Sequence, residues 1–559
     1  MINKFKSNFL IITGFLVAFF IPTILFLNRF LIPDRSYDAL VYHLFNAQRA
    51  LHNWFWQFSP NEFFPLALGN LSAFYDVLLY PFIFIFGYRL GTLPNLFAFF
   101  LITFVSYKIV NLVYPNIFKK HKILSVALLF NLTVVNQILL EVGTYKIDIL
   151  NTLLPLIGTY YLLKFTSQHT KSYKYFVIYN LIFMFVFYGK ITNSIIILPI
   201  ISVNFYLIFY SSKFSNLSIF KKVLIFVLTG IVISLLLGIH SLQNYLLSRG
   251  NPFFPLYSGF FKSPYLEYEN FADVRWGGRT LLDKITWPIL SIFQNNRLGE
   301  MHTIFYDFKL QFYWILGIIS MLFGIKNKLK ESEKLLFFLF FSSMLLWSIV
   351  FGYSRYATYS EVLGGILLFK FLDLKYTKQK VYLFGFFCIV VILTIQNLRI
   401  VKFNFGYDWA FRPPLKRNLE LHKTQIPYLF EKQIKLPIDS SQIDITLNCF
   451  LPNSGFYILS ELKNKPLINI EESSNNIYKF MANNEAYRAK VRERLSKLIS
   501  KDEYNFAILL PDDQVGKILN TCMNTLNKYP NTIENIEYTN SMMGFTHQKI
   551  IIVTGKIKI

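Results

Sequence analysis

An acid, a phenol and an imidazole stand close together just beyond the first long apolar run, in residues 36–44, Ser-Tyr-Asp-Ala-Leu-Val-Tyr-His-Leu. They belong to Asp38, Tyr42 and His43, and each can accept or donate a proton. On a helix, Asp38 and Tyr42 would share one face because they are four residues apart, and His43 would lie next to it. A carboxylate at the mouth of a helix bundle can take a proton from an acceptor hydroxyl. The alternative is structural, because Asp34 or Asp38 could instead cap a helix at the membrane surface. We predict Asp38 as a catalytic residue and keep Asp34 as the second candidate.

A second group of ionisable residues follows the third and fifth apolar runs. Glu141 opens the stretch Glu-Val-Gly-Thr-Tyr-Lys-Ile-Asp, which ends at Asp148, and Lys190 follows a Tyr-Gly pair. An unpaired charge near the membrane costs up to ~3 kcal/mol if it faces lipid. Asp148 should therefore face the interior of the bundle, where Lys146, Lys190 or an arginine could neutralise it. Asp148 is a candidate supporting catalytic residue, and a purely structural ion pair is the alternative.

Basic and amide side chains gather in later connectors. The run Asn-Tyr-Leu-Leu-Ser-Arg-Gly-Asn-Pro-Phe-Phe-Pro contains Asn244, Arg249 and Asn251. The other arginines that we expect on this side of the membrane are Arg275, Arg279, Arg297 and Arg355. Arginine binds anions such as phosphate through paired N–H donors, so these residues predict an anion site. The glycines of Trp276-Gly277-Gly278 could let backbone approach a phosphate, or could form a surface turn.

The composition shows what must position these residues. The 559 residues are 54% hydrophobic and only 16% charged, with a mean hydropathy of +0.40, which excludes a soluble globular chain. Apolar runs of about 18 or more residues recur, and each can cross the ~30 Å hydrocarbon core as a helix. The formal net charge of +24 could suggest a nucleic-acid partner, but the lysines gather in short connectors. That distribution is typical of cytoplasmic loops, so no nucleic-acid partner is expected.

We predict a polytopic α-helical membrane protein with about eleven transmembrane helices. The expected spans are 9–28, 93–113, 123–141, 145–164, 174–189, 191–210, 222–243, 311–325, 335–351, 357–373 and 380–398. This count places the amino terminus in the cytoplasm and every lysine-rich connector on the cytoplasmic face. Residues 1–399 then form the membrane domain, with long external loops at 29–92 and 244–310. Within the first loop, residues 71–86 are expected to form an interfacial or re-entrant helix rather than a span.

The composition changes after residue 399, and residues 400–559 predict a soluble extracytoplasmic α/β domain. Expected strands are 443–450, 466–470, 506–510 and 549–553, and expected helices are 485–500 and 513–529. Cys449 and Cys522 both fall in this domain. A disulfide between them stays open, because spacing alone does not show that two cysteines are close.

The motifs together resemble those of the GT-C superfamily of membrane glycosyltransferases. The run Asp-Ala-Leu-Val-Tyr-His-Leu, from Asp38, is similar to the start of the first external loop in many bacterial members. Shorter similarities follow in the same order, namely Tyr-x-x-Asp at 145–148, Tyr-Gly-Lys at 188–190, the Gly-Asn-Pro run at 244–255 and Ser-Arg-Tyr at 354–356. The resemblance covers residues 30–400. Protein O-mannosyltransferases and aminoarabinose transferases carry Asp-Glu where this chain has Asp38-Ala39, so their acceptors cannot be carried over.

The resemblance implies an enzyme of the bacterial plasma membrane that takes a sugar from a polyprenyl-phosphate donor. The sugar would pass, with inversion, to an extracytoplasmic glycan, lipid or protein acceptor. Asp38 would act as base or acceptor-positioning group and Asp148 would support it. The expected substrate-binding residues are Tyr42, His43, Glu141, Lys190, Asn244, Arg249, Asn251, Arg275, Arg279 and Arg355.

Two other functions were weighed against a glycosyltransferase, besides a purely structural scaffold. A transporter or flippase of a lipid-linked saccharide would carry charges near mid-membrane, often in two related halves. An O-antigen-type polymerase or ligase would share the lipid donor but lack the first-loop motif. No cofactor is predicted, because the eight histidines are scattered. A divalent ion held by Asp34 and Asp38 stays possible, since Mg²⁺ needs only one or two carboxylates beside phosphate oxygens.

Overall fold

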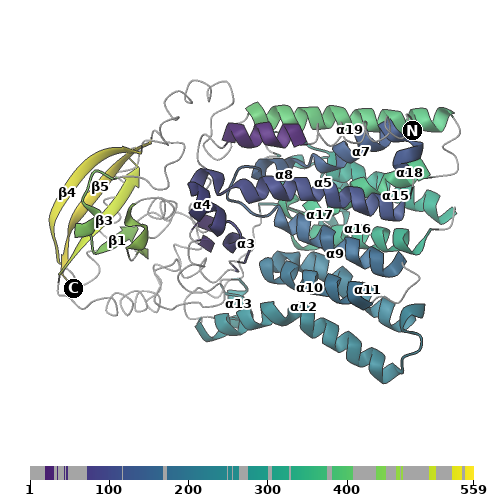
Figure 1. Ribbon diagram of the computed structural model, residues 1–559, viewed down its shortest axis with the longest axis horizontal. Helices are drawn as coiled ribbons and strands as arrows, with labels where there is room; N and C mark the ends of the chain where they lie inside the picture. Colours follow the sequence, from purple (N-terminus) through teal and green to yellow (C-terminus); the bar gives the residue numbers. More distant parts are fainter. Residues whose placement is uncertain are drawn as a thin grey trace.

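The structure is a computed structural model of the full chain. It describes residues 19–29, 34, 43–44, 46–47, 72, 74–115, 117–167, 173–247, 250–254, 256–262, 275–299, 302, 305–326, 329–373, 380–406, 436–448, 461–465, 467–469, 503–511, 532–543 and 548–558. Most of the described chain is helical, and the long helices lie side by side as a bundle, while a small β-sheet stands beyond one end of that bundle (Figure 1).

The helices follow one another through most of the first 406 residues. After an initial helical segment, Phe19–Arg29, they are α3 (Phe74–Val77), α4 (Tyr80–Leu90), α5 (Leu93–Val113), α6 (Ile117–Lys120), α7 (Lys122–Thr133), α8 (Asn136–Glu141), α9 (Leu150–Ser167), α10 (Tyr173–Gly189), α11 (Ser194–Tyr210), α12 (Ile219–Leu247), α13 (Ser258–Phe261), α14 (Leu281–Leu290), α15 (Lys309–Lys326), α16 (Glu331–Val350), α17 (Thr358–Leu367), α18 (Phe369–Asp373) and α19 (Lys380–Gly406).

Five helical segments of the described chain are long and apolar enough to cross a membrane. They are Leu93–Val113, Ile191–Tyr210, Ile219–Leu246, Glu331–Val350 and Phe384–Phe405. These segments place the chain in a membrane. Each of the eleven predicted spans overlaps a helix, but the other helices are shorter or less apolar, so the count of eleven stays a prediction.

The third predicted span, residues 123–141, is divided into α7 and α8. Val134 and Val135 leave the helical conformation between them, which frees backbone carbonyls inside the bundle. The ammonium of Lys309, at the start of α15, donates to the carbonyls of Asn131 (2.9 Å) and Val134 (2.6 Å). Non-helical backbone is tolerated at membrane depth where protein groups satisfy it, and Lys309 provides that satisfaction here.

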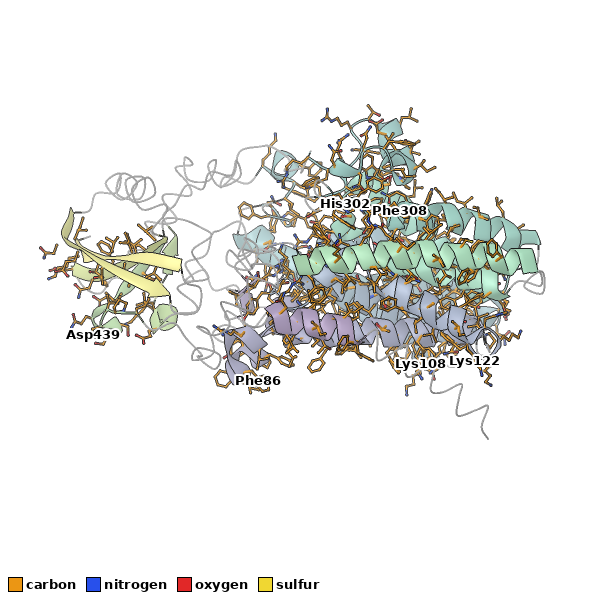
Figure 2. All side chains as sticks on the ribbon, turned by 90° about the horizontal axis from the view of Figure 1, so that it is seen from above. Phe86, Lys108, Lys122, His302, Phe308 and Asp439 are labelled. Carbon is orange, nitrogen blue, oxygen red and sulfur yellow. The ribbon has the colours of Figure 1, made fainter. Side chains whose placement is uncertain are left out.

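Lysine and aromatic side chains mark opposite ends of the bundle in Figure 2. Lys108 and Lys122 lie at the end far from the sheet, whereas Phe86, on α4, lies at the end that faces the sheet (Figure 2). The lysine-rich connector that contains Lys122 therefore lies at the end of the bundle far from the sheet. Which end faces the cytoplasm stays a prediction, based on the rule that positive loops stay inside.

The carboxyl-terminal sheet has five strands in the order β2-β1-β3-β5-β4. Here β1 (Ile445–Asn448) runs parallel to β2 (Leu467–Asn469) and to β3 (Glu503–Pro511), while β5 (Gln548–Lys558) runs antiparallel to β3 and to β4 (Thr532–Met543). The four predicted strands overlap β1, β2, β3 and β5. β4 was not predicted, because its sequence is largely polar, as is common at the edge of a sheet.

Other expectations for the carboxyl-terminal part fall outside the described residues. These are the helices expected at 485–500 and 513–529, and the cysteines Cys449 and Cys522. The α/β class of residues 400–559 and the domain boundary at residue 400 therefore stay predictions.

Candidate active site

A cavity of about 250 Å³ lies where α3, α10 and α12 meet the loops that precede α9 and α17. Its lining carries several of the residues that the sequence suggested, together with polar residues that the sequence did not single out. The polar lining residues include His43, Asn46, Ser72, Asp76, Asp148, Lys190, His240, Asn244 and Arg355. Five residues predicted from the sequence thus meet in one cavity: His43, Asp148, Lys190, Asn244 and Arg355.

Asp148 forms ion pairs with two cations in this cavity. One carboxylate oxygen accepts from the ammonium of Lys190, and the other accepts from Nε of Arg355. The amide of Asn151 also donates to Asp148, over 3.0 Å. The side chains of Asp148 and Arg355 are only 6% and 10% exposed, and that of Lys190 is 25% exposed. Since two cations share one carboxylate, the trio carries a net positive charge.

The ionisation of the trio follows from these contacts. Burial alone would raise the pKa of the Asp148 carboxyl, but Arg355 and Lys190 outweigh it and lower that pKa. Burial alone would likewise lower the pKa of Lys190, but Asp148 raises it. All three groups are therefore charged at neutral pH, and they can present positive charge to an anion.

Buried polar side chains hold the loop that carries Asp148, residues 142–149, by its backbone. Arg29 donates to the carbonyl of Val142 (2.8 Å), Asp34 accepts from the N–H of Tyr145 (2.7 Å), and Asn95 donates to the carbonyl of Thr144 (2.8 Å). These bonds satisfy loop groups that no helix can satisfy. They also fix the position of Asp148 relative to the helices.

The turn that carries Arg355 is held by close packing of two glycines. Gly277 and Gly352 both have positive φ, and a Cβ on Gly277 would lie 2.8 Å from the carbonyl oxygen of the residue before Gly352. Beside them, the ring of Trp276 stacks on Tyr353 at 5.5 Å. The Trp-Gly-Gly run thus forms a buried turn, which differs from the surface turn considered from the sequence and braces the segment leading to Arg355.

The short helix α3 brings a further acid into the cavity. The ring of Phe74 stacks on Phe185 of α10 at 5.2 Å, and Tyr75 lies so close to Gly189 that any side chain there would overlap its ring. This docking leaves Asp76 buried in the lining. Sequence reasoning missed Asp76 because it lies in the apolar stretch 71–86, where its one signal is a lone carboxylate in an otherwise apolar helix.

Asp76 is bound to two residues of the first loop. One oxygen lies 2.6 Å from Nδ1 of His43, and the other accepts from the amide of Asn46 over 2.9 Å. Both partners also line the cavity. The structure thus joins the predicted His43 to an acid that was not predicted.

Several predicted residues of the described chain lie outside the lining. Asp34 is buried and binds the backbone of the loop that carries Asp148. Glu141 is buried at the end of α8. Arg275 and Arg279 are exposed, and the guanidinium of Arg275 lies over the ring of Trp276 at 5.2 Å.

The remaining candidates are Asn251 and three residues that the structure does not describe. Asn251 is buried beside the lining, where it bonds to the N–H of Phe253 and the carbonyl of Leu256, both over 2.9 Å. The Gly-Asn-Pro run is thus a turn at the edge of the cavity. Asp38, Tyr42 and Arg249 lie outside the described residues, and their roles stay predictions.

Comparison with known proteins identifies the fold. No family model and no curated protein matches the sequence. Among solved structures, the chain is similar to ArnT from Cupriavidus metallidurans bound to undecaprenyl phosphate, with a TM-score of 0.53, 11% identity, and 98% and 97% of the two chains covered. It is also similar to the oligosaccharyltransferase of Archaeoglobus fulgidus in the apo form, with a TM-score of 0.50, 14% identity, and 90% and 70% covered. The chain has the GT-C fold.

The GT-C fold explains why motifs so far apart in the sequence meet. The resemblance predicted from the motifs is confirmed at the level of the fold. The finer similarity of the run Asp-Ala-Leu-Val-Tyr-His-Leu to that of many bacterial members is not tested by these structures. Within the described residues, no group of three or more His, Cys, Asp or Glu could hold a metal ion. The metal site considered for Asp34 and Asp38 involves an undescribed residue and stays open.

Proposed function

We propose that this chain transfers a sugar from a polyprenyl-phosphate donor to an acceptor outside the cytoplasm, with inversion at the anomeric carbon. The observation that carries the proposal is the trio of Asp148, Lys190 and Arg355 in a cavity of a GT-C fold. The similarity to ArnT, solved with undecaprenyl phosphate bound, supports the class of donor. The proposed location is the bacterial plasma membrane, with the cavity on the outer side.

In the proposed reaction, Lys190 and Arg355 bind the donor phosphate. The bond between the anomeric carbon and the phosphate oxygen breaks, and its electron pair leaves on the phosphate. Cations already in place stabilise that charge without having to reorganise as the reaction proceeds. Asp148 holds both cations in the lining, and this is its supporting role.

The acceptor would enter from the first external loop. Asp38 is the proposed base or acceptor-positioning residue, with Tyr42 and His43 beside it in the sequence. Glu141, Asn244, Arg249 and Asn251 are proposed to shape the surroundings of the substrates. Attack from the face opposite the phosphate would invert the anomeric centre in a single displacement.

The test uses the purified full chain in lipid nanodiscs. The donors are undecaprenyl phosphates that carry a radiolabelled glucose, mannose or aminoarabinose, and the acceptor is an envelope extract from a strain in which the gene is deleted. We expect label to move from one donor into the extract while free undecaprenyl phosphate appears. A nanodisc has no separate compartments, so a flippase would release no lipid phosphate. Absence of release with every donor would contradict the proposal.

A further inference from the structure

Asp76 is a buried carboxylate that has no role in the transfer reaction described above. It reaches the cavity from α3, with Oδ1 at 2.6 Å from Nδ1 of His43. Its Oδ2 accepts from the amide of Asn46 over 2.9 Å. The carboxylate is thus held at both oxygens, and it cannot turn away from the imidazole without losing the bond to Asn46.

This arrangement orients the imidazole of His43. An ionised carboxylate can only accept a hydrogen bond, so when Asp76 is ionised and His43 is neutral, the proton is on Nδ1 and the lone pair is on Nε2. Nε2 is on the opposite edge of the ring from Asp76, and His43 is one of the residues that line the cavity. Asp76 therefore sets the tautomer that a general base requires.

The surroundings of Asp76 also favour uptake of a proton by the pair that His43 and Asp76 form. Burial raises the pKa of Asp76, whereas His43 and Asn46 act in the opposite direction. A carboxylate that is costly to keep ionised favours the protonated pair. Asp148 faces the pair from the loop before α9 and also raises the pKa of Asp76. The other charged or titratable groups of the lining are Lys190, His240 and Arg355, together with the tyrosines Tyr75, Tyr188 and Tyr356.

We propose that His43 receives the proton of the acceptor hydroxyl and that Asp76 positions it for this step, an inference that rests on the proposed function. The acceptor oxygen bonds to the anomeric carbon, the bond to the phosphate oxygen breaks with its electron pair, and the hydroxyl proton passes to Nε2. The resulting imidazolium is balanced by the Asp76 carboxylate. Asp38 then keeps the acceptor-positioning role.

The first experiment probes the pair without substrate. Diethyl pyrocarbonate acylates neutral imidazole, so its rate of reaction with His43 over a range of pH, followed by mass spectrometry on the full chain in nanodiscs, reports protonation of the pair. In Asp76→Asn the midpoint should fall by about 1 to 3 pH units, because the protonated ring loses its counter-charge. In Asn46→Leu the midpoint should rise, because Asp76 loses a bond that favours its ionised form.

Two controls accompany this experiment. His121, between α6 and α7, is measured in the same samples, and its profile should not change. The matched variant is Asp283→Asn on α14, where Asp283 accepts from the N–H of the N-cap residue Thr280 and asparagine keeps an acceptor oxygen for that bond. An unchanged midpoint in Asp76→Asn would overturn the proposal, as would failure of His43 to react at any pH.

The second experiment measures transfer in the nanodisc assay. Asp76→Asn should lower transfer by about 10²-fold or more, the usual size of a general-base contribution, and should move the acid limb of the rate profile to lower pH. Transfer close to wild type with an unmoved acid limb would overturn the proposal. Failure of the proposed function looks different, because the wild-type chain itself would then release no undecaprenyl phosphate, whatever the midpoint of His43.

Discussion

Among the buried carboxylates of the described residues that pair with lysine, Glu333 and Asp148 have different surroundings. Glu333, on α16, lies 2.7 Å from the ammonium of Lys370, and its second oxygen accepts from the N–H of Lys330 over 2.8 Å. The side chains of Glu333 and Lys370 are 0% and 6% exposed, and neither lines the cavity of the candidate site. Asp148 instead pairs with two cations that line a cavity.

The difference separates a structural ion pair from a binding site. At Glu333 one carboxylate meets one lysine and both of its oxygens are satisfied, so the pair offers nothing to a ligand. At Asp148 the extra cation gives the group a net positive charge beside open space. Burying ion pairs contributes little to stability by itself, so an arrangement with excess charge favours a functional explanation.

The largest effect on transfer is expected at Arg355. Arg355→Ala should lower transfer by about 10²–10³-fold, the usual loss when one donor to a developing negative charge is removed. Arg355→Lys should restore only part of it, because lysine lacks the planar fork. The nanodisc assay at equal protein amounts measures both. Equal transfer by wild type and Arg355→Ala would show that the ion pairs of Asp148 are structural, like the pair of Glu333 with Lys370.

Lys370→Ala should affect stability rather than transfer. Removing one partner leaves Glu333 buried with an uncompensated charge, which costs about 3–5 kcal/mol. Replacing both partners by leucine should recover most of that loss. Thermal unfolding of the detergent-extracted chain measures the change. Transfer per folded molecule should match wild type, and a loss like that of Arg355→Ala would place Lys370 in the site.

An intermediate effect is expected at Gly189, which lets α3 dock against α10. In Gly189→Ala the new methyl would overlap the ring of Tyr75 and displace α3, at a cost of about 1–3 kcal/mol. Transfer should fall at equal protein amounts, because Asp76 would move with α3. Gly230→Ala is the matched control, since nothing lies within 4 Å of a Cβ at that position of α12. Equal activity of the two variants would show that the position of α3 is unimportant.

The smallest effect is expected at Asp34. The structure gives this carboxylate a backbone bond to Tyr145 rather than a place in the cavity lining. Asp34→Asn keeps an acceptor oxygen, so transfer should stay close to wild type. Asp34→Ala leaves a buried N–H unsatisfied, and stability should fall by about 1–3 kcal/mol. A loss of transfer in Asp34→Asn as large as in Arg355→Ala would show that Asp34 takes part in the transfer reaction.

The sequence predicted the charged part of the site because membrane physics restricts charges. Asp148, Lys190 and Arg355 were each expected at the outer end of a span, and a charge there must face the interior of the bundle. Their meeting in one cavity follows from that restriction. The fold could be predicted because the motifs follow one another in the order in which they occur in the GT-C superfamily.

Other features depend on contacts that the local sequence does not contain. The break between α7 and α8 requires Lys309, which is far away in the chain. Asp76 becomes informative only when α3 places it 2.6 Å from His43. The polar strand β4 is recognisable only from its pairing with β5. The role of Asp38, on which the sequence interpretation depended most, stays a prediction.

The most direct test of the central claim is the binding of undecaprenyl phosphate to the full chain, measured by native mass spectrometry. The wild type should bind it, and Lys190→Ala and Arg355→Ala should each bind about tenfold more weakly or worse, because a hydrogen bond to a charged group contributes about 1.5–3 kcal/mol. Lys370→Ala should bind like wild type, and undecaprenol, which lacks the phosphate, should not discriminate among the variants. Equal affinity for undecaprenyl phosphate in all four proteins would contradict the assignment of the donor site.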